Sequence, residues 1–257
     1  MNHRVNSKAD LEVAVIGDFQ IGKSTFVNCL VGRNDAEVGR GKSTTHENRT
    51  YLIGNGVSVI DTPGFNASGN MGASDEAKAR EAIQRSFVVI VYQDKMMGDL
   101  CRRLISEEVI AQGKKCVLLY NCKNEDRWAP SENYDIIRNV EADAFNCGFL
   151  DSCVKLGPSV VFPINAQWAL FGLGLLESEK DKGKIARYAR DKLGIDPIVD
   201  LRKEMLRQSN FLTVKHYIED LPLEVLADFL DNKDREIKRL TERFFEGLEN
   251  RLTNAGA

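Results

Sequence analysis

The chain has 257 residues, of which 43% are hydrophobic and 28% are charged, which is enough to bury one large core or one core with an appendage. The formal net charge of −3 and the pI near 5.8 exclude an overall cationic field that would favour nucleic acid or anionic lipid. No stretch of about 18 apolar residues occurs, and the N-terminal residues lack the apolar core of a signal peptide, so we expect a cytoplasmic protein. The six cysteines lack the paired spacing of a zinc site, which indicates reduced thiols.

Apolar runs and turn residues predict alternating strands and helices along the chain. Residues 11–16 form an apolar run, and residues 23–32 then place apolar side chains at helical spacing. Residues 49–53 and 57–60 flank Gly54-Asn55-Gly56, which predicts a tight antiparallel hairpin. Segments long enough for crossover helices separate three further apolar runs, at residues 87–92, 116–120 and 160–163. We therefore predict an α/β fold with three layers and a mostly parallel central sheet.

A charged stretch with few apolar residues, 177–184, is either a linker or an exposed helix turn. We place a domain edge there, with an α/β domain over residues 1–176 and a helical C-terminal extension over residues 177–257. Asp196-Pro197 resembles a helix start with proline at the first helical position, and Ser209-Asn210 resembles another start. These signals predict that the extension is helical.

A candidate phosphate-binding loop, Gly17-Asp18-Phe19-Gln20-Ile21-Gly22-Lys23-Ser24, follows the first predicted strand and opens the first predicted helix, with Thr25 next. A glycine-containing loop in that place points backbone N–H groups and the positive end of the helix dipole at a polyphosphate. The spacing Gly-x4-Gly-Lys-Ser arises by chance in roughly one chain in a hundred of this length, and the flanking strand and helix lower that figure. We therefore predict that residues 18–25 bind a nucleotide and that Lys23, a catalytic group, reaches its β- and γ-phosphates.

A magnesium ion is the predicted companion of the phosphates. Ser24 supplies a hydroxyl to Mg²⁺, whose octahedral shell is completed by phosphate oxygens, waters and a threonine. Asp61-Thr62-Pro63-Gly64 follows an apolar strand, where the Asp61 carboxylate holds Mg²⁺ through water and the Gly64 N–H contacts the γ-phosphate. An Asp-Thr-Pro-Gly turn alone is a weak signal, but its spacing from the phosphate loop makes it strong.

The polar segment between these motifs, residues 38–46, carries two candidate hydroxyls for the metal. We expect Thr45, and after it Thr44, to complete the metal sphere. His46 follows directly, but a lone histidine beside a polar loop is usually solvated, so a role as general base is the less favoured interpretation.

In this order the motifs resemble those of the translation-factor-related class of P-loop GTPases, and within it the bacterial dynamin-like and Era-like proteins. Residues 17–32 are similar to the first motif of dynamin-like GTPases, Thr44-Thr45 to the second and residues 61–64 to the third. The resemblance covers Met1 to about Leu176. It implies a P-loop GTPase fold and a Mg²⁺-dependent enzyme that hydrolyses GTP to GDP and phosphate.

The base-reading motif departs from the family pattern, which has Asn or Thr, Lys, any residue and then Asp after the fifth main strand. Cys122-Lys123-Asn124-Glu125 occupies this place. Glu125 is one methylene longer than Asp but offers the same carboxylate to the N1 and N2 edge of guanine, and Asp126 offers a competing register. Asn165-Ala166-Gln167 is similar to the fifth motif of the family, in which a backbone N–H contacts guanine O6. Both segments are therefore predicted to bind the nucleotide.

Hydrolysis needs a group that orients the attacking water, and Ras-like members of the class carry a glutamine directly after the third motif. Phe65 stands in that place and cannot orient water. The remaining candidates are the backbone of Thr45, Gln20 of the phosphate loop and a group from a second subunit, so we expect a nucleotide-dependent homodimer. Gln20 also occupies the place where some relatives bind potassium through Asn, which makes K⁺ a candidate second cation.

Three hypotheses about activity follow from these motifs. The favoured one is a GTPase switch whose loops order around the γ-phosphate and Mg²⁺. The second is a nucleotide-dependent interaction module with negligible hydrolysis, which Phe65 and the altered base-reading motif both motivate. The third is an ATPase.

Membranes and nucleic acid are the less favoured partners. Residues 221–257 contain eight acidic and six basic side chains, a net charge of −2, and so lack the polybasic face that suits anionic lipid. Arg102, Arg103 and the Lys114-Lys115 pair are charged side chains of the kind that is usually solvated, so we predict no nucleic-acid partner.

Overall fold

The computed structural model describes residues 11–36, 47–64, 72–196 and 200–224, together with positions 227, 231, 237, 238 and 241. The chain divides into two compact units, Met1–Glu219 and Asp220–Ala257. Residues 220–224 of the second unit are helical. The first unit holds the sheet and residues 179–219, and the domain edge near residue 177 stays a prediction.

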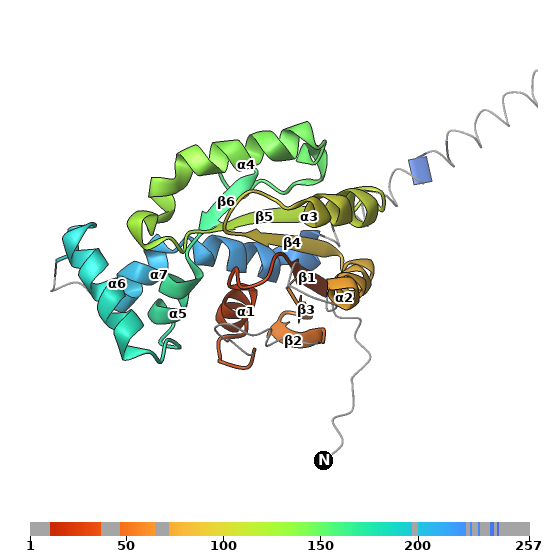
Figure 1. Ribbon diagram of the computed structural model, residues 1–257. Helices are drawn as coiled ribbons and strands as arrows, with labels where there is room; N and C mark the ends of the chain where they lie inside the picture. The colour runs from red at the N-terminus through yellow and green to blue at the C-terminus, as the bar shows by residue number, and fades with distance from the viewer. Residues whose placement is uncertain are drawn as a thin grey trace, which may run out of the picture. The chain divides into compact units, whose positions relative to one another are not determined.

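A six-stranded sheet forms the centre of the first unit (Figure 1). The strand order is β2-β3-β1-β4-β5-β6, in which the β2–β3 pair is antiparallel and the other four neighbouring pairs are parallel. This arrangement confirms the predicted α/β fold with a mostly parallel sheet. The strands are Leu11–Ile16 (β1), Arg49–Gly54 (β2), Val57–Asp61 (β3), Val88–Gln93 (β4), Lys115–Asn121 (β5) and Val161–Ile164 (β6).

Helices cover both faces of this sheet. Figure 1 shows α1 (Lys23–Val31) and α5 (Ala166–Gly172) on one side, and α3 (Asp99–Leu104) and α4 (Tyr134–Asn146) on the other. α2 (Gly72–Arg85) packs on the same face as α3 and α4, because its apolar residues join the cluster that these helices bury against the strands. That cluster includes Ala79, Ile83, Leu104, Ile137 and Val140 from the helices and Ile16, Val91 and Leu118 from the strands.

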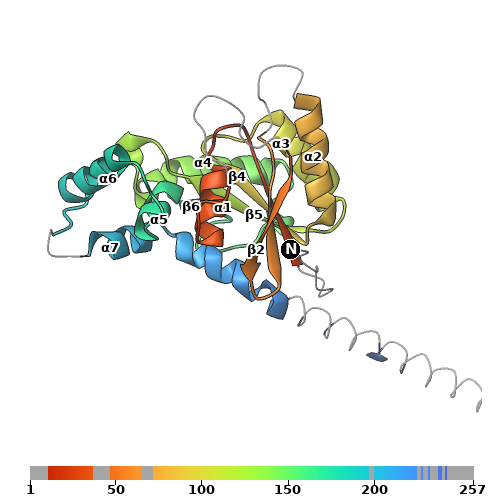
Figure 2. The same cartoon turned by 90° about the horizontal axis from the view of Figure 1, so that it is seen from below.

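A smaller set of aromatic rings fills the opposite face. Phe26 of α1 lies with its ring centroid 5.2 Å from that of Tyr92 on β4 and 6.0 Å from that of Phe211. Residues 211–219 are helical, which confirms the helix start predicted at Ser209-Asn210, and Figure 2 shows this helix beside α1. Burial of such rings is a main source of core stability, so α1 is held firmly against the centre of the sheet.

Two further helices, α6 (Glu179–Asp191) and α7 (Leu201–Gln208), follow the last strand. α7 begins four residues after the predicted start at Asp196-Pro197, because Asp200 is its N-cap and accepts hydrogen bonds from the N–H groups of residues 202 and 203. Residues 197–199 lie outside the described part of the chain. The stretch 177–184 thus contains the start of α6, and Ser178 caps that helix.

An aromatic cluster packs α6 against Trp128, which follows β5, and against Trp168 of α5. Tyr188 of α6 has its ring centroid 5.7 Å from that of Trp128 and 5.6 Å from that of Trp168. Both tryptophans are buried, and Ile185 and Met205 belong to the same cluster. The packing of these large rings determines where α6 lies in the first unit.

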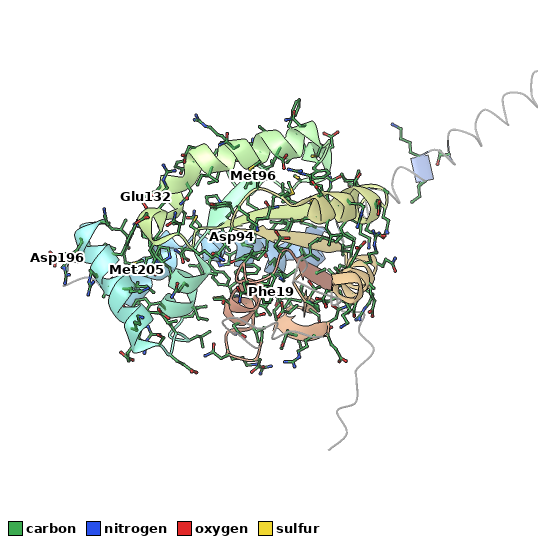
Figure 3. All side chains as sticks on the ribbon, viewed as in Figure 1. Phe19, Asp94, Met96, Glu132, Asp196 and Met205 are labelled. Atoms are coloured by element: carbon green, nitrogen blue, oxygen red, sulfur yellow. The ribbon has the colours of Figure 1, made fainter. Side chains whose placement is uncertain are left out.

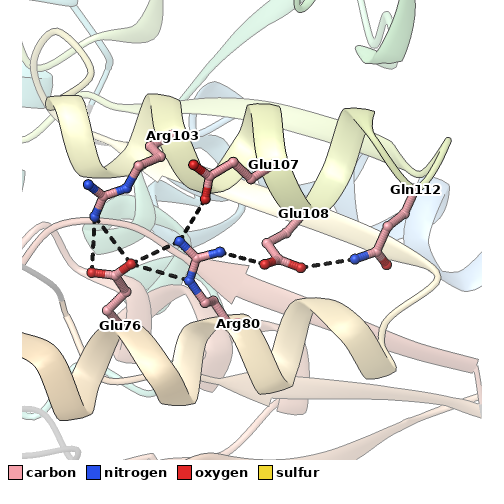
Figure 4. A network of polar contacts seen from close by, with 6 residues as sticks. All are labelled: Glu76, Arg80, Arg103, Glu107, Glu108 and Gln112. Carbon is pink, nitrogen blue, oxygen red and sulfur yellow. Dashed lines mark hydrogen bonds and ion pairs between the residues drawn. The ribbon is translucent and has the colours of Figure 1, made fainter.

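A charged network connects α2 to the end of α3, which continues as a π-helix over Ile105–Ile110 (Figure 4). Arg80 of α2 donates to Glu76 at 2.9 Å and to Glu107 at 2.8 Å, and it also bonds Glu108. Arg103 reaches Glu76 from the other side at 3.1 Å. Hydrogen bonding by Arg80 lowers the pKa of Glu76. Several shared partners make such a network stiffer than an isolated surface pair.

Among the described helices, none combines the length and the apolar character that a bilayer crossing requires.

Helix α5 approaches α7 closely at Gly172, and Gly183 of α6 offers a matched control for a substitution there. A Cβ on Gly172 would lie 2.5 Å from Leu206 Cβ and 2.8 Å from the Arg202 carbonyl oxygen, whereas a Cβ on Gly183 of α6 meets no atom within 4 Å. Gly172→Ala is therefore expected to lower the free energy of unfolding by about 1–3 kcal/mol through overpacking. Gly183→Ala should instead raise it by up to about 1 kcal/mol, because alanine is the better helix former.

Urea unfolding of the nucleotide-free protein, followed by far-ultraviolet circular dichroism, measures both changes. Equal effects of the two substitutions would contradict the close approach of α5 and α7.

Candidate functional site

The predicted phosphate loop lies between the central strand β1 and helix α1. β1 pairs with β3 and β4 in parallel, so the loop leaves the sheet at its carboxyl edge, where ligands bind in sheets of this type. α1 begins at Lys23, directly after Gly22. Gln20 adopts a left-handed backbone conformation with φ of 59°, so the loop curves back on itself between strand and helix.

The side chain of Lys23 is buried inside this loop. Its Nζ donates to the carbonyl oxygen of Gly17 at 3.1 Å and to that of Asp18 at 2.9 Å. Burial lowers the pKa of Lys23 to about 8, and the nearby carboxylates of Asp61 and Asp18 partly offset this decrease. A buried ammonium group surrounded by backbone oxygens is well placed to contact an anionic oxygen that enters the loop.

The first and third motifs meet at a hydroxyl and a carboxylate. Ser24 Oγ donates to Asp61 Oδ2 at 2.9 Å, although 37 residues separate them in the chain. The next residue, Thr62, donates from Oγ1 to the Val15 carbonyl oxygen at 2.8 Å and holds the turn against β1. Hydroxyl and carboxylate oxygens are the donors that Mg²⁺ prefers, so this pair fits a magnesium ion. Ser24 and Asp61 would hold the ion, and the ion would neutralise phosphate charge.

Gly64 brings the third motif against the backbone of the phosphate loop. A Cβ at this position would lie 2.6 Å from Phe19 Cα and 2.9 Å from Phe19 N, so any side chain would push the two segments apart. Figure 3 labels Phe19 on this loop. The contact between the Gly64 N–H and a γ-phosphate stays a prediction.

Several predicted site residues lie outside the described part of the chain. Thr45, Thr44 and His46 fall within residues 37–46, and Phe65 begins the range 65–71. The roles that the sequence suggests for them stay predictions.

Asn121, which the sequence analysis did not single out, ties the phosphate loop to the fifth motif. Its buried side chain donates from Nδ2 to the Ile21 carbonyl oxygen at 2.8 Å and accepts from the Ala166 N–H at 3.3 Å. Asn121 ends β5 two residues before Lys123, and this spacing of Asn and Lys after a strand was the available signal.

Lys123 reaches the phosphate loop from the same side. Its Nζ donates to the Gln20 carbonyl oxygen at 2.8 Å and lies 2.5 Å from Asp94 Oδ2. Asp94 follows β4 and is labelled in Figure 3. Asp18 Oδ2 lies 3.6 Å from Lys95 Nζ, which places a second ion pair beside the loop.

Asn165 joins the fourth and fifth motifs through its side-chain amide. Nδ2 donates to the carbonyl oxygens of Cys122 and Trp128, each at 2.9 Å, and Oδ1 caps α5 by accepting from the Trp168 N–H at 2.9 Å. Because all three hydrogen bonds go to backbone groups, this side chain positions the segments that it joins. Burial raises the pKa of the neighbouring Cys122 thiol, so it stays protonated near neutral pH.

A cavity of about 320 Å³ opens beside these groups. Gln20, Gly22 and Thr25 of the phosphate-loop region line one side of it. Its other walls include Asn121, Lys123, Asn165, Ala166 and Gln167, so the predicted fourth and fifth motifs share one space with the first. A volume of this size lies in the range of small-molecule binding sites.

Glu125, the predicted base-reading carboxylate, lines a different space. Its Oε1 pairs with Lys184 Nζ at 2.5 Å, and its side chain is 59% exposed. It borders a second cavity of about 260 Å³, together with Trp128, Arg187 and Tyr188. The predicted contact between Glu125 and the base of a nucleotide stays a prediction.

The site combines a strand–loop–helix cradle for phosphate, a Ser–Asp pair suited to Mg²⁺ and an adjacent cavity. These features define a P-loop nucleotide-binding protein.

Comparison with known proteins shows what this domain is similar to. Residues 12–122 match the family described as 50S ribosome-binding GTPase. GTPase Der of Brucella anthropi is 32% identical over 146 residues, and GTPase Der of Agrobacterium fabrum is 32% identical over 155 residues. Each match covers 55% of this chain and 29% of the relative. Residues 12–122 are therefore similar to the GTPase domains of this family, and the described sheet and phosphate loop agree with a P-loop GTPase fold.

One solved structure that the chain resembles is a crystal structure of Era in complex with MgGDPNP and nucleotides 1506–1542 of 16S ribosomal RNA. The match covers 62% of this chain and 51% of the Era chain, with a TM-score of 0.47 and 18% sequence identity. The chain spans less than a third of the length of the Der proteins that it matches.

The lowered pKa of Lys23 predicts how stability varies with pH. Between about pH 8 and its ordinary pKa of 10.5, Lys23 is neutral in the folded protein and protonated in the unfolded chain. The unfolded state then binds more protons, so the free energy of unfolding rises with pH in this window. From pH 8 to about pH 9.5 this contribution should amount to about 1–2 kcal/mol.

A Lys23→Met variant, which retains side-chain length without the charge, should lose this increase. Urea unfolding of both nucleotide-free proteins at several pH values measures the difference between their slopes. Parallel slopes would show that Lys23 keeps an ordinary pKa.

Removal of the Asn121 side chain should lower the stability of the protein and its affinity for nucleotide. Asn121→Ala breaks two hydrogen bonds and strands the Ile21 carbonyl oxygen, so we expect a loss of about 1–3 kcal/mol in the free energy of unfolding together with weaker nucleotide binding. Asn124→Ala is the matched control, because Asn124 is exposed and caps only the neighbouring Asp126 N–H. Differential scanning fluorimetry with and without nucleotide compares the variants. Equal shifts for the two variants would contradict the proposed tie.

Proposed function

We propose that this protein binds Mg²⁺ and GTP, hydrolyses GTP to GDP and phosphate, and acts as a molecular switch. The single observation that supports this most strongly is the meeting of Ser24 and Asp61 beside the buried Lys23. That arrangement supplies a cation for the phosphates and two oxygen ligands for the metal. Phosphoryl transfer depends mostly on such positioning and electrostatic stabilisation, so the same groups serve binding and hydrolysis.

Each described residue takes a definite role in this proposal. The N–H groups of residues 18–25 bind the phosphates, and Lys23 contacts the β- and γ-phosphates. Ser24 and Asp61 hold Mg²⁺, with Thr45 as third protein ligand. Gly64, packed against Phe19, presents its N–H toward the γ-phosphate.

The nucleoside is proposed to occupy the cavity of about 320 Å³ next to the phosphate loop. Lys123, Gln167 and Ala166 line it; the first two would flank the base, and the Ala166 backbone would face guanine O6. Asn121 and Asn165 hold these segments in place. The Der relatives support guanine as the base, and an ATPase is the alternative.

Water activation is proposed to involve Gln20, the Thr45 backbone or a group from a second subunit. Gln20 lines the cavity, and its carbonyl oxygen accepts from Lys123. A K⁺ ion beside Gln20, a nucleotide-dependent homodimer and a dynamin-like mode of activation are parts of this proposal that rest on the sequence alone. The absence of a nucleic-acid partner is likewise an untested prediction.

Turnover measured across protein concentration tests the proposal. We expect phosphate release from GTP in the presence of Mg²⁺, and a specific rate that rises with protein concentration if a dimer completes the site. Lys23→Ala and Ser24→Ala should each lower the rate at least about tenfold, because each removes a contact to charged phosphate or metal. Arg190→Ala, which alters an exposed side chain paired with its neighbour Asp191, should leave the rate unchanged.

Exchange of K⁺ for Na⁺ in the same assay tests the second cation. Competition between guanine and adenine nucleotides distinguishes the GTPase from the ATPase. Tight GTP binding without phosphate release above the Lys23→Ala level, at every protein concentration, would favour the interaction module instead.

A further inference from the structure

Recognition of guanine requires a carboxylate that faces the base, because the N1 and N2 edge of guanine presents adjacent N–H donors. The sequence offers Glu125 and Asp126 for this role, and the structure adds Asp181. Asp181 is the one of these that lines the cavity, together with Asn121, Lys123 and Ala166. We propose that Asp181 of α6 is the carboxylate that reads the guanine base, an inference that rests on the proposed binding of GTP.

Asp181 lies on the buried face of its helix. The buried residues of α6 are Asp181, Ile185, Tyr188 and Ala189, which follow the spacing of one helix face. Asp181 is 8% exposed, so its side chain is held inside the protein and not in bulk solvent. The helix therefore directs one acidic group toward the protein interior, at the end where the cavity opens.

The packing of α6 holds Asp181 in this position. Seven residues along the helix, the Tyr188 ring packs edge-on against Trp128 and at a tilt against Trp168, and its hydroxyl oxygen accepts from the Ala129 N–H at 3.3 Å. Ser178 caps the first turn by accepting from the Asp181 N–H at 3.2 Å. A side chain on a helix fixed at both ends is positioned more accurately than one on a loop, as base recognition requires.

The competing carboxylates are directed elsewhere. Glu125 pairs with Lys184, which lies three residues beyond Asp181 on α6, and borders the second cavity instead. Asp126 is exposed, and its N–H bonds the Asn124 side chain within a short 3₁₀ helix, Glu125–Arg127. The ion pair with Lys184 therefore draws Glu125 away from the nucleoside cavity while α6 supplies Asp181 to it.

The chemistry of the base edges makes this arrangement selective. The two oxygens of an ionised carboxylate accept from the N1–H and the N2 amino group of guanine. Adenine presents an unprotonated N1 at that edge, which faces the negative charge with a lone pair, so the site discriminates against it. Xanthine has an oxygen in place of the N2 amino group and is likewise rejected by a carboxylate.

Substitution by asparagine tests the assignment through a gain of binding. In Asp181→Asn the side-chain oxygen still accepts from N1–H, and the new amide N–H donates to the xanthine oxygen. We expect GDP affinity to fall at least about 100-fold, since two charge-assisted hydrogen bonds are weakened, and XDP affinity to rise above that of the unmodified protein. Glu125→Gln and Asp126→Asn are matched controls and should leave the ratio of GDP to XDP affinity within about threefold of the unmodified value.

Titration of the full chain with GDP, XDP and ADP by isothermal calorimetry separates the outcomes. A switch toward XDP in Glu125→Gln or Asp126→Asn, or an unchanged ratio in Asp181→Asn, overturns the assignment. Loss of GDP binding in Asp181→Asn without a gain of XDP also counts against it, because that result indicates a role in helix capping. Failure of the unmodified chain to prefer GDP over ADP refutes the proposed function itself and is distinguishable from all of these.

Discussion

Two buried amide side chains, Asn121 and Asn165, hold together the segments that build the site. Asn121 bonds both the phosphate loop and the start of α5, while Asn165 bonds the segment after β5. An amide offers donors and an acceptor at fixed angles, so each side chain can join backbone groups from two loops at once. Because these loops leave different strands of the sheet, the two amides fix the spacing of segments that line the cavity.

The burial of Lys23 explains why the site favours an anionic ligand. The lysine is surrounded by carbonyl oxygens and lies near Asp61 and Asp18, yet desolvation outweighs these contacts and lowers its pKa. An entering phosphate brings charge into direct contact and favours the protonated form. Ligand binding and protonation of Lys23 are therefore coupled.

The third motif and α2 are attached to different partners. Gly64 packs directly on the phosphate loop, whereas α2 is bonded through Arg80 to the helical segment that continues α3. The network in Figure 4 holds α2 against this neighbouring helical segment.

Local pattern in the sequence determined the strands, the hairpin and the phosphate loop, since apolar runs and turn residues act over a few neighbouring positions. β1, predicted over residues 11–16, spans Leu11–Ile16, and the Ser24–Asp61 meeting follows from motifs at the edges of adjacent strands. Only the tertiary structure revealed the contacts of Asn121 and the position of Asp181 beside the cavity. Asn121 joins segments about 100 residues before it and 45 residues after it, and the position of Asp181 depends on how α6 packs against Trp128 and Trp168. No short-range pattern encodes such arrangements of distant residues.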